Sequence, residues 1–453
     1  MKVDALVAEI GSTTTVVNAF TLHDTAAFVG KGVANTTVDT DVREGLREAI
    51  EDLKHNLGVD TLEYDEMFSS SSAAGGLRIT VSGLVYEMTV RAAKEAALNA
   101  GGNVHYVSAG PLDTDDLEQI LEAKPNIVIV AGGTDYGEKN VAFDNLKQIE
   151  TLVLNVPIIY AGNIDNHYRI RKHFEESSQK AHLQIVENVY PRVDFLNILP
   201  LRKVIHETFE KHIIHAKGMK HVKEMVDQAI IPTPGSVMES TMLLHEAIGN
   251  VMTIDVGGAT TDVHSVAEPS DEYRKYAEGE AKEKRTVEGD LGVFVNFHNV
   301  LSSIDRQRLM QRLGVDETTF NRLVEDYTYM PNTKEERKLV YELTRVCVNR
   351  ALDRHVGNLK KVYTSNGQKF IPEGKDLTQV QTIVLTGGPL IHLDDTERIV
   401  LDYIKQNPDQ LLPGDQVRVV KDHDYVMASL GVLSLKYKHI AQEILKKSMR
   451  LSD

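Results

Sequence analysis

One short pattern occurs twice in this chain, 246 positions apart. Glu9–Val17 has the sequence E-I-G-S-T-T-T-V-V, and Asp255–Val263 has the sequence D-V-G-G-A-T-T-D-V. In each copy an apolar run ends in a carboxylate, which is followed by glycine, threonine and β-branched residues. This order is typical of a strand, a tight turn and a second strand. The repeat therefore predicts two similar lobes, each with one hairpin.

The turn residues of both copies suit the binding of phosphate. Glycine lets the backbone come close to a ligand, and clustered N–H and hydroxyl groups bind phosphate oxygens. A carboxylate at the end of the first strand, Glu9 or Asp255, can hold a hydrated magnesium ion. We therefore expect the two hairpins to bind a nucleoside triphosphate and Mg²⁺ from the two sides of a cleft.

A third glycine motif, Ile383–Leu390, follows the two hairpins. The three motifs, in this order, resemble the phosphate-1, phosphate-2 and adenosine motifs of the actin, Hsp70 and sugar-kinase superfamily. The resemblance implies that the ligand is ATP and that Asp255 binds hydrated magnesium. It implies phosphate contacts from Gly11, Ser12, Thr13, Thr14, Gly257, Gly258 and Thr260. It also implies that Gly387 and Gly388 lie against adenosine, where a side chain would block the approach.

Further segments resemble one family within this superfamily, the MutL/GlmL family. These segments are Ser71–Leu77, Ala131–Asp135, Pro232–Gly235, Asp255–Ser265 and Val287–Gly292. The family consists of ATPase-like proteins that are associated with adenosylcobalamin-dependent mutases and aminomutases. The resemblance covers nearly the whole chain. It implies an ATP-dependent reactivating factor that releases damaged cobalamin from a mutase or aminomutase partner.

Two other functions are consistent with the same motifs. Most members of the superfamily have aspartate on the first strand, where this chain has Glu9. The longer side chain favours a nucleotide-binding assembly subunit of the mutase without turnover. A small-molecule kinase is the third possibility, although no compact motif marks the aspartate base that such a kinase needs. Two further residues are candidates for the nucleotide cleft between the hairpins. Asp262 is a candidate for orienting the attacking water, and Glu288 is a candidate for entering the cleft.

The order of apolar segments predicts an α/β fold with two ribonuclease-H-like lobes. We expect the first lobe to begin in residues 1–65 and to continue through residues 66–250, with an inserted α/β parallel unit. The second lobe is expected in residues 251–453, with a helical insertion at about residues 299–360. Predicted strands are residues 5–10, 15–20, 25–33, 251–255, 261–266 and 382–386, with a helix at 41–57.

The inserted unit contains the apolar runs 126–130, 156–160 and 183–186, separated by helical patterns at 138–152 and 166–176. Its Ala131–Asp135 loop follows a strand and precedes a helix, which is a common ligand position in open α/β sheets. The glycines of this loop either approach a phosphate or permit a sharp turn. The charged stretch Glu268–Arg285 is expected to be a solvated hairpin or loop.

Composition excludes several classes of protein. The formal net charge is -16 with acidic and basic residues interspersed, so nucleic acid is not an expected ligand. No apolar stretch is long enough to span a bilayer, and we expect a cytoplasmic protein. Cys347 is the single cysteine, which excludes internal disulfides, and its helical spacing predicts a core position. The sequence leaves the oligomeric state open.

Overall fold

The computed structural model describes residues 1–23, 25–37, 40–72, 77–213, 219–277, 281–328, 331–364 and 367–451. No helix in this part of the chain is both long and apolar enough to cross a membrane. The chain forms two compact units. Unit 1 comprises Met1–Val17, Lys31–Ser236 and Glu278–Lys284, and unit 2 comprises Asn18–Gly30, Val237–Ala277 and Arg285–Asp453.

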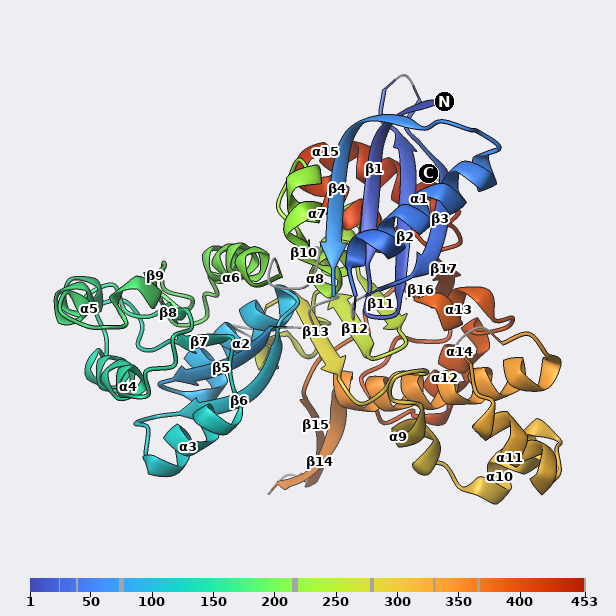
Figure 1. Ribbon diagram of the computed structural model, residues 1–453. Helices are drawn as coiled ribbons and strands as arrows, with labels where there is room; N and C mark the ends of the chain where they lie inside the picture. The colour runs from blue at the N-terminus through green and yellow to red at the C-terminus, as the bar shows by residue number, and fades with distance from the viewer. Residues whose placement is uncertain are drawn as a thin grey trace. The chain divides into compact units, whose positions relative to one another are not determined.

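The first five-stranded sheet has the order β10-β4-β1-β2-β3 (Figure 1). Counted along the chain, its strands therefore have the order 5-4-1-2-3, and β4 is parallel to both β1 and β10. The strands are β1 (Lys2–Ile10), β2 (Thr14–Thr21), β3 (Ala27–Asn35), β4 (Glu63–Ser71) and β10 (Ile231–Pro232). Helix α1 (Val42–Leu57) follows β3, and Asp41 caps it by accepting a hydrogen bond from the Arg43 N–H.

The second five-stranded sheet repeats this topology with the order β13-β12-β11-β16-β17. Strands β11 and β12 are antiparallel, whereas β16 is parallel to β11 and β17. The strands are β11 (Val251–Val256), β12 (Thr261–Val266), β13 (Glu283–Glu288), β16 (Thr382–Thr386) and β17 (Arg418–Lys421). The two sheets share the strand order expected for two ribonuclease-H-like lobes, so the predicted fold class is confirmed.

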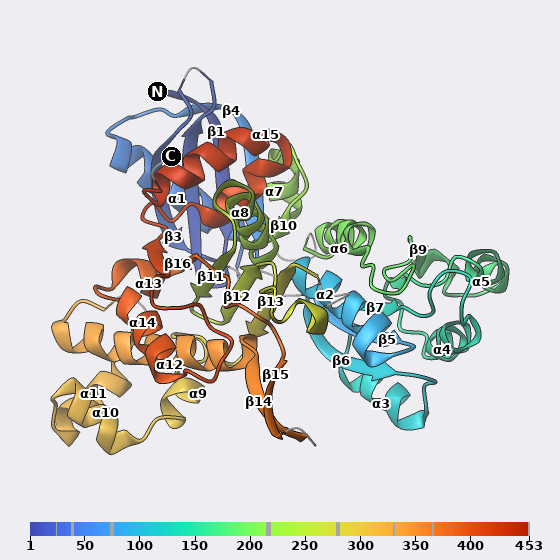
Figure 2. The ribbon, with the colours of Figure 1, turned by 180° about the vertical axis from the view of Figure 1, so that it is seen from behind.

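Helices α8 (Thr233–Ile248) and α15 (Met427–Ser448) lie side by side in unit 2 (Figure 2). The Ser240 hydroxyl donates to the Met427 carbonyl at 2.5 Å, and the Gln442 amide donates to the Leu243 carbonyl at 2.9 Å. The same unit contains α13 (Gly388–His392) and α14 (Glu397–Gln406), while α7 (Met219–Met225) belongs to unit 1. Apolar faces of α12 (Lys334–His355), α13 and α14 contribute to the core of unit 2.

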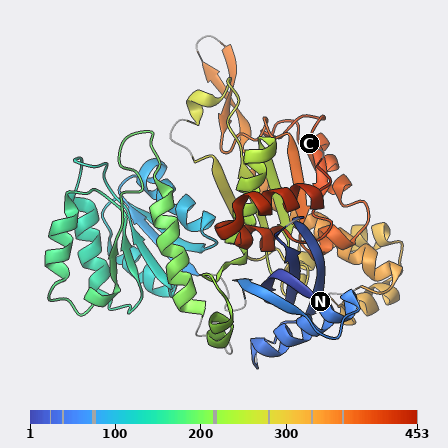
Figure 3. The same ribbon diagram turned by 90° about the horizontal axis from the view of Figure 1, so that it is seen from above.

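The predicted α/β parallel unit is present and has five strands in the order β6-β5-β7-β8-β9. Figure 3 shows helices on both sides of this sheet. The strands are β5 (Arg78–Gly83), β6 (Asn103–Ala109), β7 (Ile127–Val130), β8 (Ile158–Tyr160) and β9 (Leu183–Ile185). The helices are the π-helix Tyr86–Val90, α2 (Arg91–Asn99), α3 (Thr114–Glu122), α4 (Asn140–Thr151), α5 (Asn166–Phe174) and α6 (Ile198–Ile213). In chain order the strands run 2-1-3-4-5, a doubly wound topology.

The predicted helical insertion in the second lobe is also present. It consists of α9 (Phe297–Ser302), α10 (Arg306–Leu313), α11 (Glu317–Glu325) and α12 (Lys334–His355). Helices α9 and α10 are separate, because Asp305 has extended backbone and caps α10. Cys347 lies in α12 and is fully buried, as predicted, and burial raises the pKa of its thiol to about 12. An unpredicted hairpin follows, made of β14 (Asn358–Thr364) and β15 (Gly367–Glu373).

The expectation that Glu268–Arg285 is a solvated hairpin or loop is wrong for the last residue, Arg285, which is buried. Residues 283–285 begin strand β13. Arg285 is only 1% exposed, and its guanidinium forms a buried ion pair with Asp262 at 2.6 Å. The ion pair offsets part of the electrostatic penalty of burying this arginine, and a count of charged residues along the sequence does not reveal such a partner.

Candidate functional site

The turn between β1 and β2 is closed by one backbone hydrogen bond. The Gly11 N–H donates to the Thr14 carbonyl at 3.0 Å, and a Cβ on Gly11 would lie 2.7 Å from that carbonyl oxygen. Glycine is therefore required by the turn itself. Glu9 lies one residue before the end of β1 and is 7% exposed, and Ser12 is exposed at the tip of the turn.

The turn between β11 and β12 has the same bond between the equivalent residues. The Gly257 N–H donates to the Thr260 carbonyl at 2.9 Å. Gly257 and Thr260 are each 246 positions after Gly11 and Thr14, so the sequence repeat corresponds to a repeat of backbone geometry. Asp255, the counterpart of Glu9, occupies the penultimate position of β11.

The second turn is held in place through its carbonyl groups. The N–H groups of Phe294 and Val295 donate to the Gly258 carbonyl at 2.9 and 2.7 Å, and the Asn296 amide donates to the Ala259 carbonyl at 2.6 Å. Within the described residues, the Gly258 and Ala259 N–H groups have no hydrogen-bond acceptor. These partly exposed donors lie on a fixed turn, which is the arrangement that binds an anion.

The first turn, between β1 and β2, also presents backbone N–H groups without an acceptor among the described residues. Thr13 accepts a hydrogen bond from the Thr36 N–H at 2.9 Å through its carbonyl. The N–H groups of Ser12 and Thr13 have no acceptor among the residues that the structure describes. Each hairpin therefore presents two adjacent backbone donors next to the end of a strand that carries a carboxylate.

Asp255 lies in an unusual electrostatic environment. It is opposite Asp262 on β12 and opposite Thr386 on β16 in the sheet register. Burial, together with the negative charges of Asp262 and Asp422, raises the pKa of Asp255 to about 7, although the Arg285 charge opposes this shift. The residue as a whole is partly exposed to solvent. A cation at this position would favour the ionised carboxylate.

Asp262 differs from Asp255 because both of its oxygens have protein partners. Its Oδ1 accepts from Nε and Nη2 of Arg285 at 3.0 and 2.6 Å, and its Oδ2 accepts from the Thr260 hydroxyl at 3.2 Å. Asp262 is 3% exposed. These contacts link Asp262 to Thr260 of the turn and to strand β13.

The third motif lies beside Asp255 within unit 2. Gly387 has a φ of 90°, and a Cβ there would lie 2.7 Å from Asp255 Oδ1. A Cβ on Gly388, in contrast, would meet nothing within 4 Å. Open space at Gly388 is consistent with the close approach that the adenosine motif requires.

Asp422 was not among the predicted residues, although it belongs to this group. It is fully buried, accepts hydrogen bonds from the Val426 and Met427 N–H groups, and accepts another from the Thr386 hydroxyl at 3.1 Å. Burial raises the pKa of Asp422. The sequence does contain a signal for Asp422. This aspartate directly follows the valines and lysine of β17, just as Asp255 follows the apolar residues of β11.

Glu288 lies at the end of β13 and is 5% exposed. Its carboxylate forms an ion pair with Arg354 of α12, and Arg354 also lies 3.5 Å from Asp290. Burial raises the pKa of Glu288, while the Arg354 hydrogen bond opposes that rise. The Glu288 carboxylate therefore has a protein partner on α12.

The donor set fits magnesium that is bound largely through water and phosphate oxygens. Within the described residues, no group of three or more His, Cys, Asp or Glu side chains is arranged to hold a metal ion. Mg²⁺ is commonly bound through one or two carboxylates together with substrate phosphates. Asp255 can supply such a carboxylate, so magnesium would depend on the bound nucleotide.

The Ala131–Asp135 loop has a structural reason for its glycines. Gly133 has a φ of 66°, and a Cβ there would lie 1.9 Å from the Glu138 carbonyl oxygen. The Asn163 side chain fills the loop by donating to the Gly137 and Glu138 carbonyls at 3.2 Å. The sharp turn therefore accounts for Gly133. Residues 73–76 of the Ser71–Leu77 segment lie outside the described residues.

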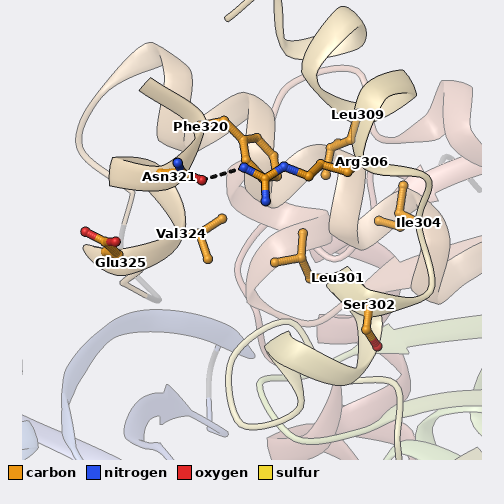
Figure 4. Close-up of a pocket in the computed structure, with 9 residues that line it drawn as sticks. All are labelled: Leu301, Ser302, Ile304, Arg306, Leu309, Phe320, Asn321, Val324 and Glu325. Carbon is orange, nitrogen blue, oxygen red and sulfur yellow. Dashed lines mark hydrogen bonds between the residues drawn. The ribbon is translucent and has the colours of Figure 1, made fainter. Parts of the chain in front are cut away.

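A cavity of about 360 Å³ occurs in the helical insertion, and none of the predicted site residues lines it. Figure 4 shows the Arg306 side chain over the ring of Phe320, with a hydrogen bond to Asn321. The guanidinium also lies 3.2 Å from Glu317, so its charge is already compensated within the insertion.

Comparison with known proteins identifies the family. Residues 5–449 match the family model described as MutL protein. Protein MutL from Clostridium tetanomorphum is 31% identical over 459 residues, which cover 98% of each chain. Among solved structures, nucleotide-free diol dehydratase-reactivating factor has a TM-score of 0.37 at 10% identity, covering 96% of this chain and 99% of that chain. Nucleotide-free acetone carboxylase has a TM-score of 0.38 at 12% identity, covering 95% and 70%. Because the family model and the curated relative span nearly the whole sequence, the chain belongs to the MutL protein family.

Proposed function

We propose that the chain is an ATP-dependent reactivating factor that releases damaged cobalamin from an adenosylcobalamin-dependent mutase or aminomutase. The observation that supports it best is the repeated turn, in which Gly11–Thr14 and Gly257–Thr260 make the same hydrogen bond. Each turn leaves backbone donors available beside a carboxylate. Membership of the MutL family suggests the mutase or aminomutase as the partner.

In this proposal the two hairpins bind the phosphates of one ATP molecule. Gly257, Gly258 and Thr260 contribute from one turn, and Gly11, Ser12, Thr13 and Thr14 from the other. Asp255 holds hydrated magnesium, and Gly387 and Gly388 allow adenosine to approach the backbone. Asp262 accepts hydrogen bonds from Thr260 and Arg285, so its role is to position the turn. Coupling to the mutase requires that the ATP and ADP forms bind it with different affinities.

The test measures phosphate release from Mg-ATP, alone and with a mutase loaded with hydroxocobalamin, while free cobalamin is followed by absorbance. We expect ATP-dependent cobalamin release, which the Asp255→Asn variant loses. Asp271→Asn removes one negative charge at an exposed aspartate and serves as the matched control, with release unchanged. Cobalamin release that persists without ATP, or in Asp255→Asn, would contradict the proposal.

An assembly subunit without turnover is the second candidate, and Glu9 is the residue that favours it. Its carboxylate extends one methylene further than the aspartate of most superfamily members. Under this alternative the protein binds ATP and the mutase but releases no phosphate, and Glu9→Asp does not change cobalamin exchange. Phosphate release that depends on a small substrate, with no effect of the mutase, would instead indicate a kinase.

A further inference from the structure

The hairpin β14–β15 forms a two-stranded sheet of its own in unit 2. Figure 1 shows it in orange, extending from the end of α12 away from the other strands of that unit. An isolated two-stranded hairpin is only marginally stable in water, and its open edges are able to pair with another chain. We therefore expect this projecting hairpin to contact another protein surface.

One face of the hairpin carries two exposed aromatic rings beside a cation. Lys361 and Phe370 are opposite each other in the register, and Tyr363 lies two residues from Lys361 on the same face. The Lys361 ammonium is 5.6 Å from the centre of the Tyr363 ring. Tyr363 is 77% exposed and Phe370 is 56% exposed. We call this set of three residues the hairpin face.

The charge of the hairpin is opposite to that of the whole chain. Its two strands contain Lys360, Lys361 and Lys369 but only one acidic residue, Glu373, which pairs with Lys360 at 3.2 Å. The full chain has a formal net charge of -16. Such a basic element is attracted to acidic surfaces, and the rest of this protein is acidic.

Helix α3 offers a surface that complements the hairpin face. Asp115, Glu118 and Glu122 are exposed and spaced so that they lie on one side of the helix, which contains no basic residue. Leu121, beside this row, is 45% exposed. The surface thus combines carboxylates with an apolar side chain, as the hairpin face combines an ammonium group with aromatic rings.

We propose that the hairpin face of one copy of this chain binds helix α3 of a second copy. Tyr363 and Phe370 would pack against Leu121, and Lys361 would pair with the carboxylates. The proposal is a reciprocal contact, in which each copy supplies one hairpin face and one helix α3, and such an isologous contact closes as a dimer. Aromatic anchors surrounded by charged residues are the usual composition of the centre and rim of an interface. This inference does not depend on the proposed function.

The test is sedimentation equilibrium of the full-length chain over a range of concentrations, at about 0.05 M and about 0.5 M salt. We expect a dimer that weakens at high salt. Lys361→Glu should weaken dimerisation at least tenfold, and adding Glu118→Lys in the same chain should restore it. Restoration by the reversed pair separates a lost contact from misfolding.

Tyr363→Thr with Phe370→Thr removes the rings while keeping residues suited to strands, and it should also weaken dimerisation. The matched control replaces two exposed tyrosines elsewhere, Tyr168→Ser with Tyr276→Ser, and should leave the dimer intact. A wild-type chain that is monomeric throughout would overturn the proposal, as would a dimer that the hairpin variants do not change. A monomer whose hairpin variants lose binding to a different protein would overturn it in favour of that partner.

Discussion

Gly387 lies directly beside Asp255 in unit 2. A Cβ on Gly387 would come within 2.7 Å of Asp255 Oδ1 and within 2.3 Å of the Val256 carbonyl oxygen. The φ of Gly387 is 90°, a conformation that other residues adopt only with strain. The third glycine motif and the second hairpin are therefore parts of one arrangement, and the absence of a side chain at Gly387 makes this arrangement possible.

The first prediction concerns this glycine. Gly387→Ala should destabilise the protein by about 2–4 kcal/mol, because it adds backbone strain to a steric overlap. Gly388→Ala should leave stability nearly unchanged, since a Cβ there meets nothing within 4 Å. Urea unfolding of both variants measures the difference. Equal stability of the two variants would contradict the role assigned to Gly387.

Gly388→Ala separately tests the adenosine contact. If Gly388 lies against adenosine, the added methyl group should weaken ADP binding at least tenfold while the protein stays folded. Isothermal titration calorimetry of ADP with wild type and Gly388→Ala provides the measurement. Unchanged ADP affinity in a stable variant would show that adenosine binds elsewhere.

The second prediction concerns the pH dependence that Asp255 introduces. Its pKa is raised to about 7 in the folded state, whereas an unfolded aspartate has a pKa near 3.9. Between these values the folded state binds more protons than the unfolded state, so this contribution to stability falls as pH rises and levels off above about 7. Asp255→Asn should therefore be more stable than wild type at pH 8, by on the order of 2–4 kcal/mol, and less so at pH 5.

Urea unfolding at the two pH values checks this prediction, with Asp271→Asn as the control for loss of one surface charge. Magnesium and ADP together should reduce the difference in unfolding free energy between Asp255→Asn and wild type at pH 8, because a cation favours the ionised Asp255. A stability difference between Asp255→Asn and wild type that is the same at pH 5 and pH 8 would contradict the raised pKa.

The sequence was sufficient to predict the features that depend on local pattern. The carboxylate, glycine and threonine order predicted both hairpins, and their shared spacing predicted two lobes of the same topology. Asp41 and the following amphipathic residues similarly specify α1, which begins one residue after the expected position. These features follow from side-chain periodicity and turn chemistry, which neighbouring residues determine.

Features that depend on distant partners were not predicted. Arg285 is buried because strand β12 places Asp262 beside it, and 23 positions separate the two in the sequence. Glu288 is buried against Arg354 of a helix that comes 66 positions later. The hairpin β14–β15 was missed because lysines interrupt its apolar alternation and both faces are largely exposed. Tertiary contacts decide these cases, whereas the local pattern is ambiguous.

The third prediction concerns the buried ion pair between Arg285 and Asp262. Arg285→Met should destabilise unit 2 by about 3–5 kcal/mol, because it leaves the Asp262 carboxylate buried without its cation. The double variant Arg285→Met with Asp262→Leu should recover most of this loss. Urea unfolding of the two single variants and the double variant gives the coupling free energy. Additive effects of the two substitutions would show that the pair is not coupled.

The last prediction concerns His264, on strand β12 next to the same cluster. Its side chain is fully buried, and neither ring nitrogen has a hydrogen-bond partner among the described residues. Burial and the nearby Arg285 charge hold the pKa of His264 well below its usual value. The folded state therefore does not take up the proton that the unfolded state binds below about pH 6.5, so stability falls as pH falls through that range.

Replacing the imidazole by a side chain of similar volume removes this cost. His264→Leu should be more stable than wild type at pH 5 by on the order of 2 kcal/mol beyond any difference at pH 8. The difference at pH 8 reports the change in packing and the loss of two unpaired nitrogens, which is expected to favour leucine as well. Chemical unfolding of both proteins at the two pH values separates these contributions. If wild type and His264→Leu lose the same stability between pH 8 and pH 5, His264 takes up a proton in the folded protein and must have a partner or access to water.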